Sequence, residues 1–196
     1  MKGVILFYRI IYADLQMDVT ALSKFLSYVL RHHPESIGLD VDDNGWAQIS
    51  ELTKKAQDEG RHFDRDAIQQ IIQKSSKQRF ILSGDGKYIR AGYGHSIDVD
   101  LQLKPKVPPQ KLYHGTSRNT VASIFREGLK ARSRNFVHLS TTVNEAHKVG
   151  IRHGEPVILL VFSGRMSREG HDFYQSESEE GVWLTSYVPP EYIEQK

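Results

Sequence analysis

Cysteine is absent from this chain of 196 residues. Its absence excludes disulfide scaffolds, cysteine-ligated zinc or iron–sulfur sites, and thiol nucleophiles. A run of about 18 apolar residues is also missing, so the sequence predicts no membrane-spanning helix. Both features are typical of a protein from a reducing compartment, and we expect a cytoplasmic location.

An excess of charge of one sign is lacking too, because the formal net charge is only +2. Nucleic-acid binding would therefore require a local cluster of basic residues rather than an overall positive charge. The nine histidines lack the spacing of a zinc motif such as HExxH, and we expect no metal site. The phosphate-binding signatures GxGxxG and GxxxxGKS/T do not occur, nor does the GxSxG of serine hydrolases.

The hydrophobic fraction of 39% is enough for a buried core, and its pattern in the first half of the chain is helical. Apolar residues recur at helical spacing over 22–30, and Pro34 stops that helix. A second helix is predicted over 49–56, with Gly60 just beyond its end. A third helix begins after Asp64, which is a good N-cap. Its expected core residues are Ile68, Ile71 and Ile72.

A β-hairpin is predicted to follow these helices. The segments RFILS (79–83) and KYIRA (87–91) flank a turn at Gly84–Gly86. Three short helices followed by a hairpin are the order of a winged helix, which we predict over 17–97. The preceding residues 1–16 lack the cleavage site of a signal peptide. We interpret them either as a mispredicted start before the true first residue, or as an extra strand or helical turn.

The second half of the chain has a different character. Residues 98–111 carry three prolines and no helical period, which predicts an extended linker. Beyond it, a helix capped by Ser117 and ending at Gly128 is predicted to bury Val121, Ile124 and Phe125. Short strands are predicted at LYHG (112–115), FVHLS (136–140), PVILLVF (156–162) and VWLT (182–185). We therefore expect an α+β lobe over 112–196.

Several arginine and histidine residues lie at the ends of these predicted elements or within the short strands. They are Arg31, His32, Arg79, His114, Arg134 and His138. At a helix C-terminus, Arg31 and His32 would complement the helix dipole. Arg79 and Arg134 would ordinarily be solvated, the latter within a basic stretch over 126–134 that is typical of a surface loop. Taken singly, none of these residues indicates a function.

The order of longer motifs is more informative. From Ser23 to Tyr192 the chain closely resembles the RNA 2′-phosphotransferase family (KptA-like). The motifs are SKFLSYVLRHHPESIGL (23–39), GWAQISEL (45–52), KQRF (77–80), IRAGYGHS (89–96), LYHGT (112–116), SRNFVHLS (133–140), RHGEPVIL (152–159) and FYQSESEEGVWLTSYVPPEY (173–192). HGT alone would be a weak signal, whereas LRH, KxRF, HGT and RxxVHLS in series are specific.

The resemblance implies a winged-helix RNA-binding lobe joined to an NAD-binding lobe of the ADP-ribosyltransferase type. It implies an enzyme that removes an internal 2′-phosphate from RNA, of the kind left at a splice junction, by transferring it to NAD+. The expected path runs through an RNA-2′-phospho-ADP-ribose intermediate to RNA with a free 2′-hydroxyl, nicotinamide and ADP-ribose 1″,2″-cyclic phosphate. We expect NAD+ as co-substrate, RNA bearing the 2′-phosphate as partner, and a monomer.

By motif, the resemblance implies that Arg31, His32, Arg79 and Arg134 form the catalytic set. Guanidinium groups bind phosphate oxygens bidentately and stay charged at any working pH, which suits a reaction that brings several phosphates together. Nicotinamide leaves as a neutral base, so His32 would move a proton in the second step, either as acid or as base.

The resemblance also implies a cofactor-binding set, namely His114, Gly115, Thr116, His138 and Ser140. A glycine beside the strand would allow close approach of the backbone to the dinucleotide. Arg152 and His153 are weaker candidates for the same pocket or for RNA. His95 is a weak candidate for contact with RNA or between the lobes.

One position departs from the family pattern, and two rival functions remain open. Glu180 stands where the family usually has asparagine; it would either broaden the choice of acceptor or be a solvated turn residue. The first rival is an ADP-ribosyltransferase acting on nucleic-acid ends or protein. The second is a non-catalytic winged-helix protein that binds nucleic acid and senses NAD, although the third predicted helix is poor in arginine.

Overall fold

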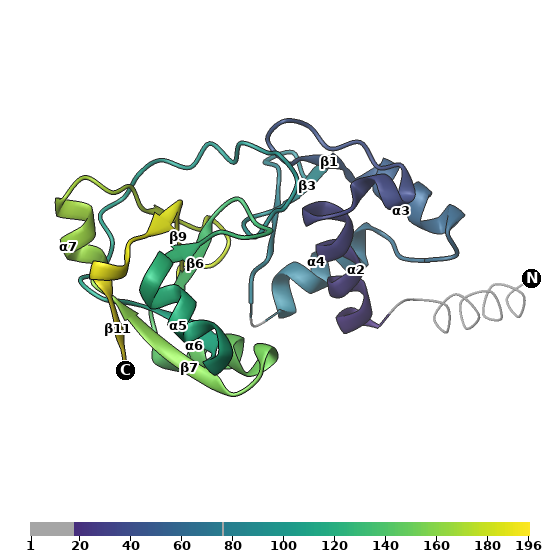
Figure 1. Ribbon diagram of the computed structural model, residues 1–196. Helices are drawn as coiled ribbons and strands as arrows, with labels where there is room; N and C mark the ends of the chain where they lie inside the picture. The colour runs from purple at the N-terminus through teal and green to yellow at the C-terminus, as the bar shows by residue number, and fades with distance from the viewer. Residues whose placement is uncertain (1–17, 76) are drawn as a thin grey trace, which may run out of the picture. The chain divides into compact units, whose positions relative to one another are not determined.

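The computed structural model describes residues 18–75 and 77–196 (Figure 1). The interpretation of residues 1–16 therefore lies outside the described residues. The chain divides into two compact units between Ala91 and Gly92. Both units combine helices with antiparallel sheets, in agreement with the predicted α+β class. Within the described part of the chain, no helix has the length and apolar character needed to cross a membrane.

Over residues 18–75 and 77–91, the first unit has three helices, one 3₁₀ turn and a small antiparallel sheet in the order β1-β3-β2. In chain order its elements are α2 (Val19–Arg31), η1 (Pro34–Ile37), β1 (Ala47–Gln48), α3 (Ile49–Asp58), α4 (Arg65–Lys74), β2 (Phe80–Leu82) and β3 (Tyr88–Ala91). The three predicted helices and the hairpin are confirmed, and Phe80 pairs with Ala91 across the hairpin. The two-residue strand β1, which pairs with β3, was not predicted.

Local signals explain where these helices begin and end. The Asp64 carboxylate accepts a hydrogen bond from the backbone N–H of Ala67 at 2.8 Å, and so caps α4 as predicted. Gly60 adopts φ +75° just after α3, a conformation that residues with a β-carbon rarely take. Helix α2 ends at Arg31, before the 3₁₀ turn that Pro34 begins.

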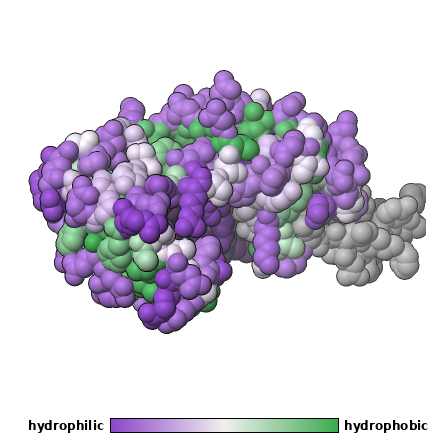
Figure 2. All heavy atoms as spheres, viewed as in Figure 1, coloured by the Kyte–Doolittle hydropathy of each residue, from purple (hydrophilic) through white to green (hydrophobic). Residues whose placement is uncertain are grey.

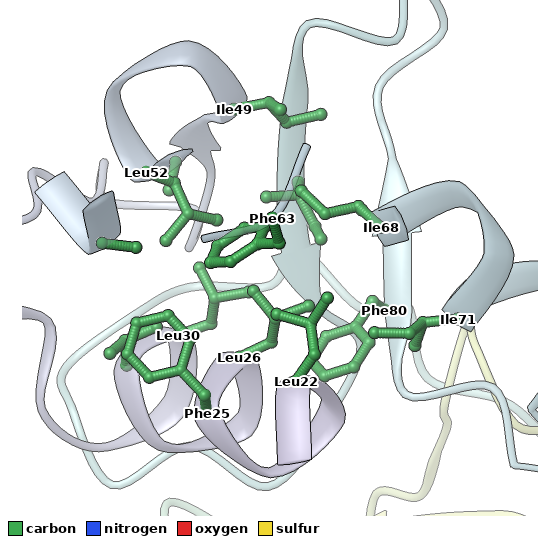
Figure 3. Packing of buried hydrophobic residues seen from close by; sticks show 14 of the residues in the cluster. Leu22, Phe25, Leu26, Leu30, Ile49, Leu52, Phe63, Ile68, Ile71 and Phe80 are labelled. Atoms are coloured by element: carbon green, nitrogen blue, oxygen red, sulfur yellow. The ribbon is translucent and has the colours of Figure 1, made fainter. Parts of the chain in front are cut away.

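The apolar faces of the three helices pack together in one hydrophobic core. Leu26 and Leu30 of α2, Leu52 of α3 and Ile68 of α4 are all 0% exposed. Figure 3 shows these side chains converging on the ring of Phe63. Of the three isoleucines predicted to be buried in α4, Ile68 and Ile71 are buried, whereas Ile72 is only partly covered.

The second unit is built on a six-stranded sheet with the order β11-β7-β4-β6-β9-β8. Its elements are β4 (Leu112–Ser117), α5 (Arg118–Glu127), β5 (Leu129–Lys130), β6 (Val137–Ser140), α6 (Val143–Gly150), η2 (Ile151–His153), β7 (Pro156–Val161), α7 (Ser163–Arg168), β8 (Tyr174–Gln175), β9 (Val182–Thr185), β10 (Tyr187–Val188), η3 (Pro190–Tyr192) and β11 (Ile193–Gln195). The four predicted strands are present. Burial of Phe125 in α5 was wrong, because its side chain is 38% exposed.

The two faces of this sheet are covered by different elements. On one face, Leu112 and Leu159 join a core that includes Ile124 of α5 and Met166 of α7. On the other face, α6 packs closely on β4, which it contacts at Gly115. Side chains of one strand alternate between these faces, so neighbouring residues of β4 meet different surroundings.

The boundary of the second unit differs from the predicted one. Residues 98–111 form no helix or strand, and some of them are hydrogen-bonded to this unit. The backbone N–H of Lys106 donates to the Phe173 carbonyl at 2.8 Å, and the Ser163 hydroxyl donates to the Pro109 carbonyl at 2.7 Å. Leu101 is 7% exposed. The segment 92–97, predicted as part of the first lobe, also belongs to the second unit.

The face of the molecule shown in Figure 2 is mainly polar. In the space-filling view, hydrophilic side chains cover most of the visible face, and hydrophobic side chains gather in small patches (Figure 2). Among the large hydrophobic residues described, Val107 has the highest exposed fraction, 84%. A polar ligand therefore suits this surface better than an extended apolar partner.

Candidate functional site

The sheet of the second unit opens between its two central strands. Strand β4 pairs with β7 at six positions, but with β6 only where Tyr113 faces Ser140. Just beyond that pair, the ring Nδ1 of His114 lies 3.0 Å from the backbone carbonyl oxygen of His138. The His114 side chain thus takes the place of a backbone hydrogen bond between the strands, at the point where β4 and β6 separate.

The hydrogen bond of His114 defines its protonation state. A carbonyl oxygen can only accept, so Nδ1 carries the proton and donates it. Burial is the largest influence on this ring and lowers the pKa of His114 below its usual 6.5, and the charges of His153 and Arg132 lower it further. The ring is therefore neutral at pH 7 and its Nε2 is an unprotonated acceptor. It can accept a hydrogen bond from a hydroxyl or amide group of a ligand.

Gly115 lies where α6 packs against β4. A β-carbon at this position would lie 1.7 Å from the backbone oxygen of Ala146 and 2.9 Å from the backbone nitrogen of Gly150. The absence of a side chain therefore allows α6 to pack directly on β4. The expected close approach of a dinucleotide at Gly115 stays a prediction.

Thr116 is directed toward α5 on the face that His114 shares. Its hydroxyl lies 2.6 Å from that of Thr120, which itself donates to the Ser117 carbonyl at 2.8 Å. The Thr120 proton is thus engaged, so Thr116 is the donor between the two hydroxyls. Thr116 is 8% exposed, and its side chain ties β4 to the first turn of α5.

His138 and Ser140 face the opposite side of the sheet from His114. Ser140 pairs with Tyr113, one residue before His114, and residues two apart on β6 share a face. The ring of His138 lies 6.0 Å from that of Tyr93, centroid to centroid. The sequence motifs HGT and VHLS are therefore adjacent, but their histidine side chains do not point to one place.

A small pocket beside His138 is lined by the segment that follows Tyr93. Its walls include Gly94, Leu101 and Phe136. His95 also lines it but is only 2% exposed, and its carbonyl accepts a hydrogen bond from the backbone of Asn135 at 3.1 Å. The position of His95 inside this unit does not support its predicted contact with RNA.

Positive charges gather at the end of the sheet where β4 ends and β6 and β7 begin. Arg132 and Arg134 lie in the loop before β6, and Arg152 and His153 lie in η2 just before β7. The backbone of η2 is held close to β4, since a β-carbon on Gly150 would lie 3.1 Å from the Thr116 carbonyl. The strand order therefore brings these three arginines and one histidine to the same end of the sheet.

These charges are close enough to affect one another. Arg132 and His153 both lower the pKa of His114. Desolvation lowers the pKa of Arg134, Tyr93 raises it, and Arg152 lowers it; the guanidinium remains charged at neutral pH. Among the described residues, neither Arg132, Arg134 nor Arg152 has an acidic partner within ion-pair distance. The edge is therefore suited to binding an anion.

The remaining predicted catalytic residues all belong to the first unit. Arg31 ends α2, and its guanidinium carbon lies 6.0 Å from the centroid of the Phe80 ring. Arg79 directly precedes Phe80, and its Nη1 lies 3.5 Å from the Ser75 hydroxyl. His32 is the C-cap of α2. The packing of Phe80 thus joins the end of α2 to the start of β2, although 48 residues separate Arg31 from Arg79 in the sequence.

Two further residues define the site, and sequence analysis assigned neither of them. Arg132 was interpreted as part of a surface loop, and only its position near His114 distinguishes it. Asn135 holds the loop before β6, because its side chain donates to the Ile97 carbonyl at 3.0 Å. Glu180 is exposed in a turn whose carbonyl accepts a hydrogen bond from Gln175, which agrees with a solvated turn residue. Among the described residues, no group of three or more His, Asp or Glu could hold a metal ion.

Comparison with known proteins identifies the family to which the chain belongs. Residues 16–187 match the family model described as RNA 2′-phosphotransferase, Tpt1 / KptA family. The chain is 46% identical over 179 residues to a probable RNA 2′-phosphotransferase of Acaryochloris marina, covering 91% of this chain and 98% of the relative. It is 49% identical over 176 residues to the Flavobacterium johnsoniae protein of the same name, covering 90% and 96%. On this evidence the chain is a transferase that belongs to the RNA 2′-phosphotransferase, Tpt1 / KptA family.

Proposed function

We propose that this enzyme removes an internal 2′-phosphate from RNA, of the splice-junction type, by transferring it to NAD+. The products would be RNA with a free 2′-hydroxyl, nicotinamide and ADP-ribose 1″,2″-cyclic phosphate. The observation that carries the proposal is a group of three arginines, Arg132, Arg134 and Arg152, at the end of the sheet where β4 ends and β6 begins. They have no acidic partners among the described residues and lie near His114.

The residues at this edge fit a dinucleotide that carries a diphosphate. Arg132, Arg134 and Arg152 supply planar donors for phosphate oxygens. The neutral His114 offers Nε2 as an acceptor for a ribose hydroxyl. When bound, NAD+ would supply the ribose carbon to which the phosphate is transferred and nicotinamide as the leaving group. We assign Arg134 to the migrating phosphate. Several positive charges are needed there, because the negative phosphates that come together repel one another.

Residues of the first unit would bind the phosphate of the RNA. The order α2, β1, α3, α4, β2, β3 supports the assignment of this unit as a winged-helix RNA-binding lobe. The Arg31 side chain is 9% exposed and is fixed against Phe80, so little of its conformational freedom remains to be lost on binding a phosphate. His32, at the end of the same helix, would move the proton of the second step.

The test uses an RNA with a single internal 2′-phosphate, incubated with and without NAD+. Phosphate loss is followed on a gel, and the cyclic phosphate product is measured by mass spectrometry. We expect NAD-dependent phosphate loss in the wild type and a large decrease in Arg134→Ala. Arg126→Ala is the matched control, because Arg126 lies in the same basic stretch but pairs with Glu127.

Other results would overturn the proposal in distinct ways. If NAD+ is consumed while the RNA keeps its phosphate, the enzyme is an ADP-ribosyltransferase with another acceptor. If both molecules are unchanged but RNA is bound, the chain is a binding protein that senses NAD. Equal activity in Arg134→Ala and Arg126→Ala would remove Arg134 from the site.

A further inference from the structure

Arg132 has an unfavourable backbone conformation. Its φ is +53°, and among the described residues the one other residue with a β-carbon and a positive φ is Gln102. The backbone N–H of Arg134 donates to the Ala131 carbonyl at 3.1 Å, so residues 131–134 form a β-turn with Arg132 in its second position. Turns with a positive φ at this position favour glycine, asparagine or aspartate. Arginine at this position needs an explanation, since strained residues cluster at binding and catalytic sites.

The Arg132 side chain has no partner within the described protein to explain its position. It is exposed and takes part in no ion pair or hydrogen bond among the described residues. Its neighbours in the chain behave differently, because Arg126 and Lys130 both pair with Glu127, at 2.6 Å and 3.1 Å. Arg132 therefore differs from these neighbours in having no acidic partner among the described residues.

The turn precedes β6, the strand whose His138 carbonyl accepts the hydrogen bond of His114. Arg132 and Arg134 occupy the second and fourth positions of one turn, immediately before β6. The positive charge of Arg132 acts on His114, at the point where β4 and β6 separate. Asn135 anchors the other end of the loop through hydrogen bonds to the carbonyls of His95 and Ile97. A positive charge is thus held in a fixed turn beside the neutral His114.

We propose that Arg132 binds the diphosphate group of an adenine dinucleotide held at His114, while Arg134 remains free for the phosphate of the RNA. This inference rests on the proposed function, because that function supplies the dinucleotide. A diphosphate carries two adjacent negative groups, and a guanidinium can bind both with parallel N–H donors. The charge of Arg132 acts on His114, whereas Arg134 is influenced by Tyr93 and Arg152, so we assign the two arginines different ligands.

Binding is measured by calorimetry with ADP-ribose, which contains the diphosphate, and separately with the 2′-phosphorylated RNA. We expect Arg132→Gly to weaken ADP-ribose binding by about tenfold or more, because a charge-assisted contact is lost. RNA affinity should be unchanged. The glycine variant should be at least as stable as the wild type toward denaturant, since glycine adopts the positive φ without strain.

Two further variants complete the design. Arg132→Lys keeps the charge but loses the planar donors, and we expect an intermediate affinity for ADP-ribose. Arg126→Ala should bind ADP-ribose as the wild type does. Unchanged affinity in Arg132→Gly, or weakening confined to the RNA, would overturn the inference. If ADP-ribose binding weakens as expected while the wild type removes no 2′-phosphate, the inference stands and the proposed function fails.

Discussion

The Nδ1 atom of His114 donates to the backbone carbonyl of His138 across the opening between β4 and β6, at 3.0 Å. This contact joins the two strands where their own backbone pairing has stopped after Tyr113 and Ser140. The ring must be neutral to leave Nε2 as an acceptor. Protonation of the ring would keep the Nδ1 hydrogen bond but would remove the Nε2 acceptor and place a charge in a buried position. Ligand binding at the opening and the stability of the fold therefore both depend on the protonation of one histidine.

This dependence predicts a loss of stability in mild acid. The pKa of His114 is lower in the folded chain than in the unfolded one, so the unfolded state takes up a proton first as the pH falls. Stability should therefore decrease as the pH is lowered below about 6.5, measured as the denaturant midpoint between about pH 8 and pH 5. His114→Asn should show a weaker dependence, and a variant of the exposed His147 should behave as the wild type. Parallel curves for the wild type and His114→Asn would contradict this account.

Gly115→Ala should destabilise the second unit strongly. The new β-carbon would lie 1.7 Å from the Ala146 backbone oxygen, and neither backbone can move without separating α6 from β4. We expect a loss of about 3 kcal/mol or more in the free energy of unfolding. Gly84→Ala is the control, because no atom lies within 4 Å of its added β-carbon. A stable Gly115→Ala protein that only loses NAD+ affinity would restore the expected role in dinucleotide approach.

Phe80→Leu should reduce activity more than stability. The substitution keeps an apolar side chain in the core but removes the ring beside the Arg31 guanidinium. We expect a cost of about 1 kcal/mol in unfolding and a clear decrease in 2′-phosphate removal. Phe63→Leu is the matched variant, since Phe63 lies in the same core but contacts the Phe25 ring instead. Equal activity losses in the two variants would assign the effect to the core alone.

Asn135→Ala should disturb the loop that carries Arg134. It removes the side-chain hydrogen bond to Ile97 but keeps the backbone bond to His95. We expect about 1 kcal/mol of destabilisation. Asn135→Asp should reduce activity further, because a carboxylate would repel the Ile97 carbonyl. Unfolding and activity measurements on Asn119→Ala, an exposed asparagine of α5, provide the comparison. Wild-type activity in both Asn135 variants would show that Arg134 is positioned by other contacts.

Local signals account for most of the first unit. The N-cap Asp64, the glycine at position 60 and the turn before Tyr88 act over a few residues, so the sequence predicted these helices and the hairpin. Strand β1 was missed because it is only two residues long and pairs with a strand some 40 positions later. Phe125 was misplaced because apolar spacing indicates a helix face without showing which residues at its margin are covered.

The site depends on contacts that the sequence does not encode locally. The catalytic positions were assigned by motif, and that assignment stays a prediction. The meeting of Arg132, Arg134 and Arg152 at one edge follows from the strand order, which connects segments about 20 residues apart. The role of Gly115 could not be predicted either, because α6 itself was not predicted.

The hydrogen bonds along residues 98–111 have a consequence for how this protein can be divided. A fragment beginning at Leu112, where the sequence alone would place the start of the second lobe, would lose Pro109 and Gln110, whose carbonyls bind the first turn of α7. It would also lose Gly92, where the side chain of Ser178 fills the space that a β-carbon would need. The module that evolution could combine with other domains, or that an engineer could graft, therefore starts at residue 92 and carries its own connecting segment with it.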